Sequence, residues 1–558
     1  MASIAKSLVG PLSELAGSSN NVTAIGIGVA TALLLLALYF AMSTQSNDPP
    51  SLGETIPFLS NSLQMASDSK AFWARALRKM QKLDSEILRF RLAGRRAFLV
   101  TGETKTNPLF RTNAGFSSDY YLNLLVDVMF GPTKRDLARF VADVSGRGKI
   151  PLPGTEQIAE KDRLWTGWHS IFADNLSRTK PTNELGARFF SNFATRIDNL
   201  FHPGDWHTIQ VADFLHRHQT ECAAKALNGT RVFEENPDYF ELLDAFELAI
   251  MPIAFGPPKW LNPKPYRARA RFLAMNHKYM EGALKRYDWG SPEASSPWEP
   301  VFGSPLTRSL VRWGLDVGLD TQTIAGIFGI QVSNQNANSV PASAWAIMNS
   351  LVSPDTELLG KLRQEATAAT MLDPDTGTRT FDIQKLVAMP WLQAVYTETL
   401  RLRLAFSVTR DAVHDTEIDG FRIPKGSMVQ APIPIAHYSA VWNVEGHGTD
   451  EFWPRRHLTT VETTSDSGEV YFREEFGIGS RSAYFFPYGG GINICPGRFF
   501  AKQEIIGTIA LFVAQFEAEV VGWVMHDGSP SDREARNGAG MALSQPDRDL
   551  KIRVKRIW

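Results

Sequence analysis

The chain has 558 residues, of which 44% are hydrophobic, enough for one large domain or roughly two to three smaller ones. Its 58 Lys and Arg residues balance 59 Asp and Glu residues, which argues against a nucleic-acid partner. The two cysteines, Cys222 and Cys495, are too few for a disulfide framework and favour a reducing compartment.

The first predicted element is an uncharged apolar segment, residues 22–42, which follows an N-terminal tail, residues 1–21. Its length matches the ~30 Å hydrocarbon core of a bilayer, so we predict a transmembrane anchor. A cleaved signal peptide is the alternative, but its apolar part is normally shorter and is followed by a cleavage site of small residues. Residues 43–60 contain three prolines that stiffen the chain, and we expect a hinge there before a globular domain, residues 61–558.

Within this domain the pattern predicts mainly helices, with small sheets near both ends. Residues 86–102 are typical of a hairpin with its turn at Ala93 and Gly94. From about residue 118 to 400 the apolar residues recur at helical spacing. Short strands return over residues 410–434, where Asp419 and Gly420 form a strong two-residue hairpin signal.

Two polar patterns stand inside the helical part. The segment NQNANS, residues 334–339, interrupts an apolar stretch and is followed by Pro341, which predicts a kink. Glu398 and Arg401 are three residues apart and share one helical face, where a carboxylate can accept a bidentate guanidinium bond. Taken alone, either pattern is also common on a solvated helix face.

Near the C-terminus, FFPYGGGINICPGRFFAKQE places Cys495 behind three glycines and ahead of a helical pattern. The glycines permit a close backbone approach, and amides at a helix N-terminus stabilise a thiolate. A buried inert cysteine and a nucleophile paired with a distant His are the alternatives. Zinc is disfavoured because no second cysteine or His pair lies nearby in the sequence.

This loop resembles the haem-ligand signature of the cytochrome P450 family, F-x-x-G-x-R/H-x-C-x-G followed by Ala. The matching positions are Tyr488, Gly491, Asn493, Cys495, Gly497 and Ala501. Tyr488 replaces Phe, and Asn493 replaces the Arg or His that usually contacts a haem propionate. The resemblance implies that Cys495 is the axial ligand of haem b iron, with Gly491, Asn493 and Gly497 beside the cofactor.

The resemblance extends to two further motifs and covers the chain from about residue 49 to 558. Glu398 and Arg401 match the family's E-x-x-R, and DEFWPRRHL supplies Arg456 as the third member of a Glu-Arg-Arg network. Arg410 matches a propionate-binding arginine, and His169 stands in W-x-x-x-H where the family has W-x-x-x-R. A solvated charge is the alternative for Arg410. The implied fold is the mainly helical P450 fold with small β-sheets and an N-terminal transmembrane helix.

The central polar segment is similar to that of the sterol hydroxylase and prostacyclin synthase branch, in which Asn replaces the usual Thr. Ala337 then takes the position of the usual acid, and Asn338 and Ser339 take those of the two Thr residues. Asn338 can donate a hydrogen bond but cannot relay a proton directly, so water must do so. We predict that Asn338 and Ser339 are the catalytic residues.

The resemblance implies a membrane-anchored haem-thiolate monooxygenase that oxidises a lipophilic molecule, sterol-like, terpenoid-like or another specialised metabolite of a biosynthetic pathway. We expect a single-pass protein of the endoplasmic reticulum with its catalytic domain, residues 61–558, in the cytosol. The chain after Cys495 is too short for a flavin domain, so we expect electrons from NADPH through a separate cytochrome P450 reductase. Arg498 and Lys502 are candidate docking charges for the reductase, and a solvated face is the alternative for them. A haem-thiolate isomerase or dehydratase that uses neither O2 nor NADPH is the alternative, and a non-catalytic haem sensor is a third.

Overall fold

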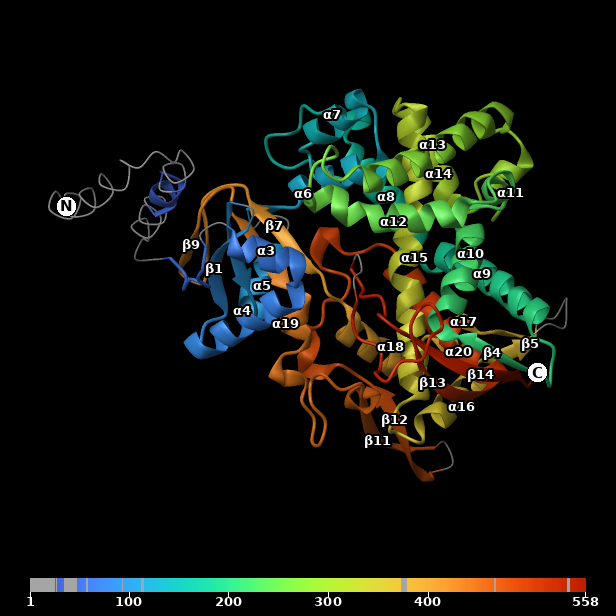
Figure 1. The fold of residues 1–558 in the computed structure, drawn as a ribbon. Helices are drawn as coiled ribbons and strands as arrows, with labels where there is room; N and C mark the ends of the chain where they lie inside the picture. The colour runs from blue at the N-terminus through green and yellow to red at the C-terminus, as the bar shows by residue number, and fades with distance from the viewer. Residues whose placement is uncertain are drawn as a thin grey trace. The chain divides into compact units, whose positions relative to one another are not determined.

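The computed structural model of the chain describes residues 26, 28–34, 48–56, 59–92, 94–111, 115–372, 379–465, 468–538 and 542–557 (Figure 1). The chain divides into two compact units. The first comprises Met1–Pro108 and Arg410–Ala431, and the second comprises Leu109–Thr409 and Pro432–Trp558. The architecture is mainly helical with small sheets, as the sequence predicts.

Most of the predicted anchor, residues 22–42, and all of the tail lie outside the described residues. Gly26 and residues 28–34 are helical. Within the described parts of the chain, no helix is both long and apolar enough to cross a membrane.

The first unit is built on a β-sheet beside two helices, α3 (Ser60–Ser67) and α4 (Ser69–Leu83). Strands β1 (Ile87–Leu92) and β2 (Arg95–Val100) form the predicted antiparallel hairpin, and β10 (Met428–Pro432) pairs with β2 in parallel. The sheet continues to β7 (Ser407–Ala412) beyond β10.

The second predicted hairpin of the first unit is confirmed. Strands β8 (Thr416–Ile418) and β9 (Phe421–Ile423) pair antiparallel around Asp419 and Gly420, both with positive φ, as a two-residue primed turn requires. Inside the predicted hinge, residues 43–60, the Pro50 carbonyl accepts the backbone N–H of Arg89 at 2.8 Å. This part of the hinge is therefore fixed to the first unit.

The second unit holds most of the helices (Figure 1). Its longer helices are α8 (Leu164–Leu176), α9 (Thr179–Leu200), α10 (Val211–Asn228), α12 (Tyr239–Phe255), α13 (Pro263–Arg286), α14 (Pro305–Asp316), α15 (Thr321–Leu351), α16 (Leu358–Ala368), α18 (Pro390–Arg403) and α20 (Arg498–Gln515). Its shorter helices are α6 (Asp119–Leu125), a π-helical turn (Val126–Phe130), α7 (Lys134–Ala142), α11 (Arg231–Glu235), α17 (Ile383–Leu386) and α19 (Ile433–His437). Helix α5 (Glu103–Phe110) begins in the first unit and ends in the second.

Small antiparallel sheets complete the second unit. One sheet has the order β13 (Phe516–Val524), β14 (Asp549–Arg556) and β4 (Trp206–Gln210). The others are the hairpins β5 (Thr370–Leu372) with β6 (Arg379–Phe381) and β11 (Leu458–Thr464) with β12 (Val470–Phe476).

Helix α15 is the centre of the second unit, and it packs against α10, α13, α14, α18 and α20 (Figure 1). The Asp320 side chain caps its first turn by accepting the Gln322 N–H at 2.8 Å. Almost every residue from Thr323 to Ser350 is buried, because a largely apolar helix belongs in a core. The chain stays helical on both sides of Pro341.

The backbone of α15 comes very close to the π-helical turn. A Cβ on Gly326 would overlap the carbonyl oxygen of Phe130, so only glycine fits this crossing. By contrast, Gly360 on α16 has open space where its Cβ would lie.

We predict that Gly326→Ala destabilises the protein by about 1–3 kcal/mol or more, because a rigid carbonyl cannot move aside as a side chain can. Gly360→Ala should instead stabilise it by up to ~1 kcal/mol through helix propensity. Thermal or urea unfolding of the two variants measures the difference. Equal midpoints would show that the crossing can relax.

Candidate active site

Cys495 lies in the loop between a short 3₁₀ turn, Gly491–Asn493, and helix α20. Its backbone N–H donates to the Tyr488 carbonyl at 3.0 Å, and the Ile494 N–H donates to the Gly491 carbonyl at 3.1 Å. These bonds fold the loop back on itself and leave the Cys495 side chain exposed.

The sulfur lies at the N-terminus of α20. Burial raises the pKa of the Cys495 thiol, and the backbone amides of Gly497 and Arg498 offset part of that rise. The Cys495 side chain is exposed, although protein lies close around the sulfur. A metal ion bound to the sulfur would stabilise its thiolate.

The glycines of the loop also have a packing role that the sequence did not show. Gly491 has φ +64°, and a Cβ there would overlap the carbonyl oxygen of Phe110 at the end of α5. The space beside Gly490 is filled by the Phe110 ring in the same way. The loop therefore needs glycine both for its backbone angles and for its contact with Phe110.

Helix α15 has a polar opening in the middle of its buried length. Asn334 is exposed, and Gln335 and Asn338 are half-buried, although their neighbours on both sides are buried. Asn334 and Asn338 are four residues apart and so lie on one face. The middle of this core helix therefore presents a partly exposed polar face.

The structure ties Asn338 to the C-terminal segment. Its side-chain oxygen accepts the backbone N–H of Leu543 at 3.0 Å, so the amide NH2 is the part left to donate elsewhere. Ser339 is buried, and its carbonyl accepts the Ser343 hydroxyl at 3.0 Å. The two predicted catalytic residues therefore differ in environment, because Asn338 is partly exposed and Ser339 is buried.

Glu398, Arg401 and Arg456 form one fully buried cluster. Arg401 donates Nε to Glu398 Oε2 at 2.8 Å and Nη2 to Oε1 at 2.9 Å, while Arg456 Nε donates to Oε1 at 2.7 Å. All three side chains are 0% exposed. The remaining guanidinium protons are donated to backbone carbonyls, among them those of His437 and Gly448.

His457 is a fourth member that sequence reasoning missed. Its Nε2 lies 2.9 Å from Glu398 Oε2, with both side chains fully buried. Burial lowers the pKa of His457, so the neutral ring donates Nε2–H to the carboxylate. The run Pro-Arg-Arg-His contains two arginines, of which Arg456 joins the cluster. The neighbouring Arg455 turns outward, and its Nε donates to Asp355 Oδ2 at 2.6 Å.

The partners of Glu398 outweigh its burial. Burial by itself raises the pKa of this carboxyl, but hydrogen bonds from Arg401 and His457 reverse the effect and hold the pKa far below its usual range. Glu398 is therefore an anion throughout the neutral pH range, fixed between α18 and the turn Pro454–His457.

The two predicted propionate contacts lie on separate elements. Arg410 is a buried residue of β7 in the first unit, and burial lowers its pKa. His169 lies on α8 in the second unit, where burial and Arg147 lower its pKa. Trp165, the first residue of the W-x-x-x-H match, donates its indole N–H to the Phe140 carbonyl at 3.1 Å.

The residues considered for reductase docking are less free than the sequence indicates. Lys502 donates to Gln393 Oε1 at 2.6 Å, and burial lowers the pKa of its amine to about 8. Arg498 donates to the Cys495 carbonyl at 3.1 Å. Cys222 is buried, which raises the pKa of its thiol to about 12 and fits a structural thiol.

A second contact beside Cys495 was also missed. The hydroxyl groups of Tyr396 on α18 and Tyr488 are 2.7 Å apart. The replacement of Phe by Tyr at position 488 was a signal, because a buried phenol needs a partner.

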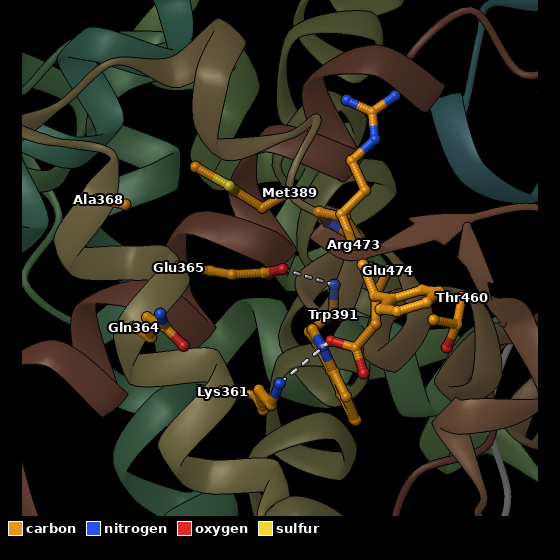
Figure 2. A pocket seen from close by; sticks show the side chains of 11 residues that line it. Lys361, Gln364, Glu365, Ala368, Met389, Trp391, Thr460, Arg473 and Glu474 are labelled. Atoms are coloured by element: carbon orange, nitrogen blue, oxygen red, sulfur yellow. Dashed lines mark hydrogen bonds and ion pairs between the residues drawn. The ribbon is translucent and has the colours of Figure 1, made fainter. Parts of the chain in front are cut away.

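A separate open pocket of about 500 Å³ lies among α16, α18 and the β11–β12 hairpin (Figure 2). There Glu365 accepts the backbone N–H groups of Trp391 and Leu392, each at 2.9 Å, and so caps α18. Lys361 and Glu474 form an ion pair at 3.3 Å across it. None of the predicted site residues lines this pocket, and we assign its groups a structural role.

Known proteins are similar to this chain in sequence and in fold. The family model described as Cytochrome P450 matches residues 340–551. A cytochrome P450 monooxygenase of Penicillium decumbens is 38% identical over 96% of this chain and 97% of its own length. Another, from Hypoxylon pulicicidum, is 29% identical over 89% of this chain and 88% of its own.

Two further matches are partial or remote in sequence. The cholesterol 7-alpha-monooxygenase of Cricetulus griseus is 26% identical over 40% of this chain and 43% of its own. The solved heme domain of a cytochrome P450DA mutant superposes with a TM-score of 0.58 over 91% of this chain and 97% of that one, at 15% identity. The last likeness shows the fold.

We predict that Glu398→Ala lowers the free energy of unfolding by roughly 3–5 kcal/mol, because two buried guanidinium groups lose their counter-charge. The matched control is Glu519→Ala, which removes an exposed pair with Arg553 and should cost at most ~1 kcal/mol. Urea unfolding measures both. A small effect at Glu398 would mean that the backbone carbonyls alone satisfy the two arginines.

Proposed function

We propose a specific role for this chain, which belongs to the cytochrome P450 family of monooxygenases and is an oxidoreductase of that family. It is a membrane-anchored enzyme that transfers one oxygen atom of O2 to a lipophilic small molecule. The observation that carries the proposal is an exposed thiol, Cys495, at the N-terminus of α20 in a glycine-rich loop.

The donor set fits a haem. A single thiolate is one of the axial ligands by which proteins of this family hold haem iron. Cys495 is the axial ligand, and Gly491, Asn493 and Gly497 lie against the cofactor. Arg410 and His169 are the proposed propionate contacts.

When bound, the haem supplies oxygen activation, which thiolate ligation favours by promoting O–O cleavage. The chain's own residues provide the orientation. The NH2 group of Asn338 donates a hydrogen bond to an ordered water that can carry a proton. Its oxygen stays on Leu543 and fixes the direction of that donor.

The polar face of α15 indicates the substrate class. Asn334 and Asn338 place two amides on a helix whose other core residues are largely apolar. A substrate site lined by this helix would favour an apolar molecule with one or two hydroxyl or carbonyl groups. A sterol-like or terpenoid-like specialised metabolite meets this description, and the cholesterol 7-alpha-monooxygenase among the relatives supports it.

The same family membership supports the location and the electron source. Residues 22–42 anchor the protein in the endoplasmic reticulum membrane, with the catalytic domain in the cytosol. Electrons from NADPH arrive through a separate cytochrome P450 reductase. The hydrogen bond between Arg89 and Pro50 supports a tether that is fixed at its domain end.

The iron ligand is tested by the chain's two cysteines. The reduced protein with carbon monoxide should absorb at the position typical of thiolate-ligated haem. Cys495→Ala should lose this band, whereas Cys222→Ala should retain it because Cys222 is a buried structural thiol. A band that survives in Cys495→Ala would refute the assignment.

The role of Asn338 is tested with two variants and a ligand chosen by its shift of the haem Soret band. Asn338→Leu should slow product formation by roughly 10²–10⁴-fold and release hydrogen peroxide instead, since positioned proton transfer is lost. Asn338→Asp keeps an oxygen for Leu543 but lacks the amide donor, and it should be impaired as well. A near-normal Asp variant would assign the effect to the Leu543 contact, and product formed without NADPH or O2 would establish the isomerase alternative.

The anchor is tested by fractionation of cells that express the full chain or a form without residues 1–47. The full chain should sediment with microsomes, and the truncated form should move substantially to the soluble fraction, because the uncharged span is gone. Protease added to intact microsomes should digest the catalytic domain. Full protection of that domain would reverse the topology.

A further inference from the structure

The direction of the Asn338 amide depends on a connecting segment. Leu543, whose backbone N–H donates to Asn338 Oδ1 at 3.0 Å, lies in the connection between β13 and β14. It belongs to neither strand and forms an isolated antiparallel bridge with Leu404, just beyond the end of α18. Because an amide group is planar, the position of the Leu543 N–H also sets the direction in which the Asn338 NH2 group points.

The backbone next to Leu543 is held by residues of α18 and α15. The Ser544 N–H donates to the Arg403 carbonyl at 2.9 Å. The Ser544 carbonyl accepts the indole N–H of Trp345 at 2.8 Å. Trp345, Leu543 and Ser544 are all buried, so no surface water competes for these bonds. A shift of Leu543 therefore requires that these two contacts break.

The guanidinium group of Arg403 joins these partners. Its carbon lies 3.6 Å from the centre of the Trp345 ring, while Nη1 donates to Asn537 Oδ1 at 2.9 Å and Nη2 to Asn349 Oδ1 at 3.2 Å. Asn537 donates its NH2 group to the Leu402 carbonyl at 3.1 Å. Burial lowers the pKa of Arg403 to about 10, so the group is a cation at neutral pH. A planar guanidinium can stack on an indole and donate from its edge at the same time, which a lysine ammonium cannot do.

The contacts on α15 lie along one face of the helix. Trp345 and Asn349 follow Asn338 by about two and three helical turns. Their side chains therefore lie on the same side of α15 as Asn338. Along this face, Asn338 holds Leu543, Trp345 holds Ser544, and Asn349 holds Arg403.

We infer that Trp345, Arg403 and Asn537 form a clamp that positions Asn338 through the backbone of Leu543 and Ser544. The three are positioning residues, because they act on Asn338 through this backbone. The inference rests on the proposed function, in which the Asn338 NH2 group orients a water that carries a proton. It names the residues on which the direction of that donor depends.

The first test measures the backbone of the segment in the full-length holoprotein by amide hydrogen exchange. Trp345→Phe keeps an aromatic ring under Arg403 but lacks the indole N–H for Ser544, and Arg403→Lys keeps the charge but loses the planar stack. Each should speed exchange of the peptide that contains Leu543 and Ser544 by roughly tenfold, as expected when one such contact is lost. Unchanged exchange in both variants would refute the clamp.

A second stack of the same kind provides the matched controls. The Arg188 guanidinium on α9 lies 3.8 Å from the Trp298 ring, and the Trp298 indole N–H donates to the Lys225 carbonyl on α10 at 3.2 Å. Arg188→Lys and Trp298→Phe remove the same two kinds of contact there. Both should leave exchange of the Leu543 peptide as in wild type. Equally fast exchange in these controls would show a general loosening of the fold and overturn the inference.

The second test measures coupling with the ligand chosen by its Soret shift. Trp345→Phe and Arg403→Lys should each lower the product formed per NADPH by roughly tenfold and raise hydrogen peroxide, because a displaced donor no longer orients its water. When either change is added to Asn338→Leu, coupling should fall no further, since the clamp acts through Asn338. A further fall in the double variant would show that the clamp acts on another group, which contradicts the inference.

Ligand affinity separates the clamp from a substrate contact. The Kd from the Soret titration should stay close to that of wild type in Trp345→Phe and Arg403→Lys. Weaker binding with unchanged product per NADPH would assign these residues to substrate binding and refute the inference. If wild type forms no NADPH-dependent product, the monooxygenase function itself fails, while the exchange measurement still decides whether the clamp holds Leu543.

Discussion

The anion of Glu398 is the contact on which the order of the second unit depends. It joins α18 to the turn Pro454–His457, and Arg401 and Arg456 extend the connection to backbone carbonyls at His437 and Gly448. One carboxylate neutralises only one of the two guanidinium charges, so these carbonyls must stabilise the remaining positive charge by accepting hydrogen bonds. Such a buried network is weak as a source of net stability, but it permits few alternative arrangements of the segments that it joins.

The chemistry of the site is divided between two helices that this network helps to hold in place. Helix α20 presents the sulfur of Cys495 at its N-terminus. Helix α15 carries Asn338 and Ser339 in the middle of its length. Its packing on α20, and the glycine crossing at Phe130, leave it little freedom to shift.

The departures from the usual family pattern become consistent when they are taken together. Asn338 lacks the hydroxyl of the usual Thr, but its side-chain oxygen accepts the backbone N–H of Leu543. This contact fixes the direction of the amide NH2 group. Tyr488 replaces a Phe and finds the hydroxyl of Tyr396. Each change of residue type is thus matched by a neighbour that only the folded chain provides.

The sequence by itself determined the fold class, the hairpins at residues 86–102 and 416–423, and the family, because these depend on local spacing and on motifs. It also placed Glu398, Arg401 and Arg456 in one network, since two of them share a helical face and the third follows a fixed motif. It could not determine that His457 joins this network and that Arg455 does not. That depends on which side chains of the turn Pro454–His457 face the core. Nor could it determine that the side-chain oxygen of Asn338 accepts the backbone N–H of Leu543, 205 positions later in the chain. Only the packing of the C-terminal segment against α15 decides this contact, because it depends on tertiary structure and not on local spacing.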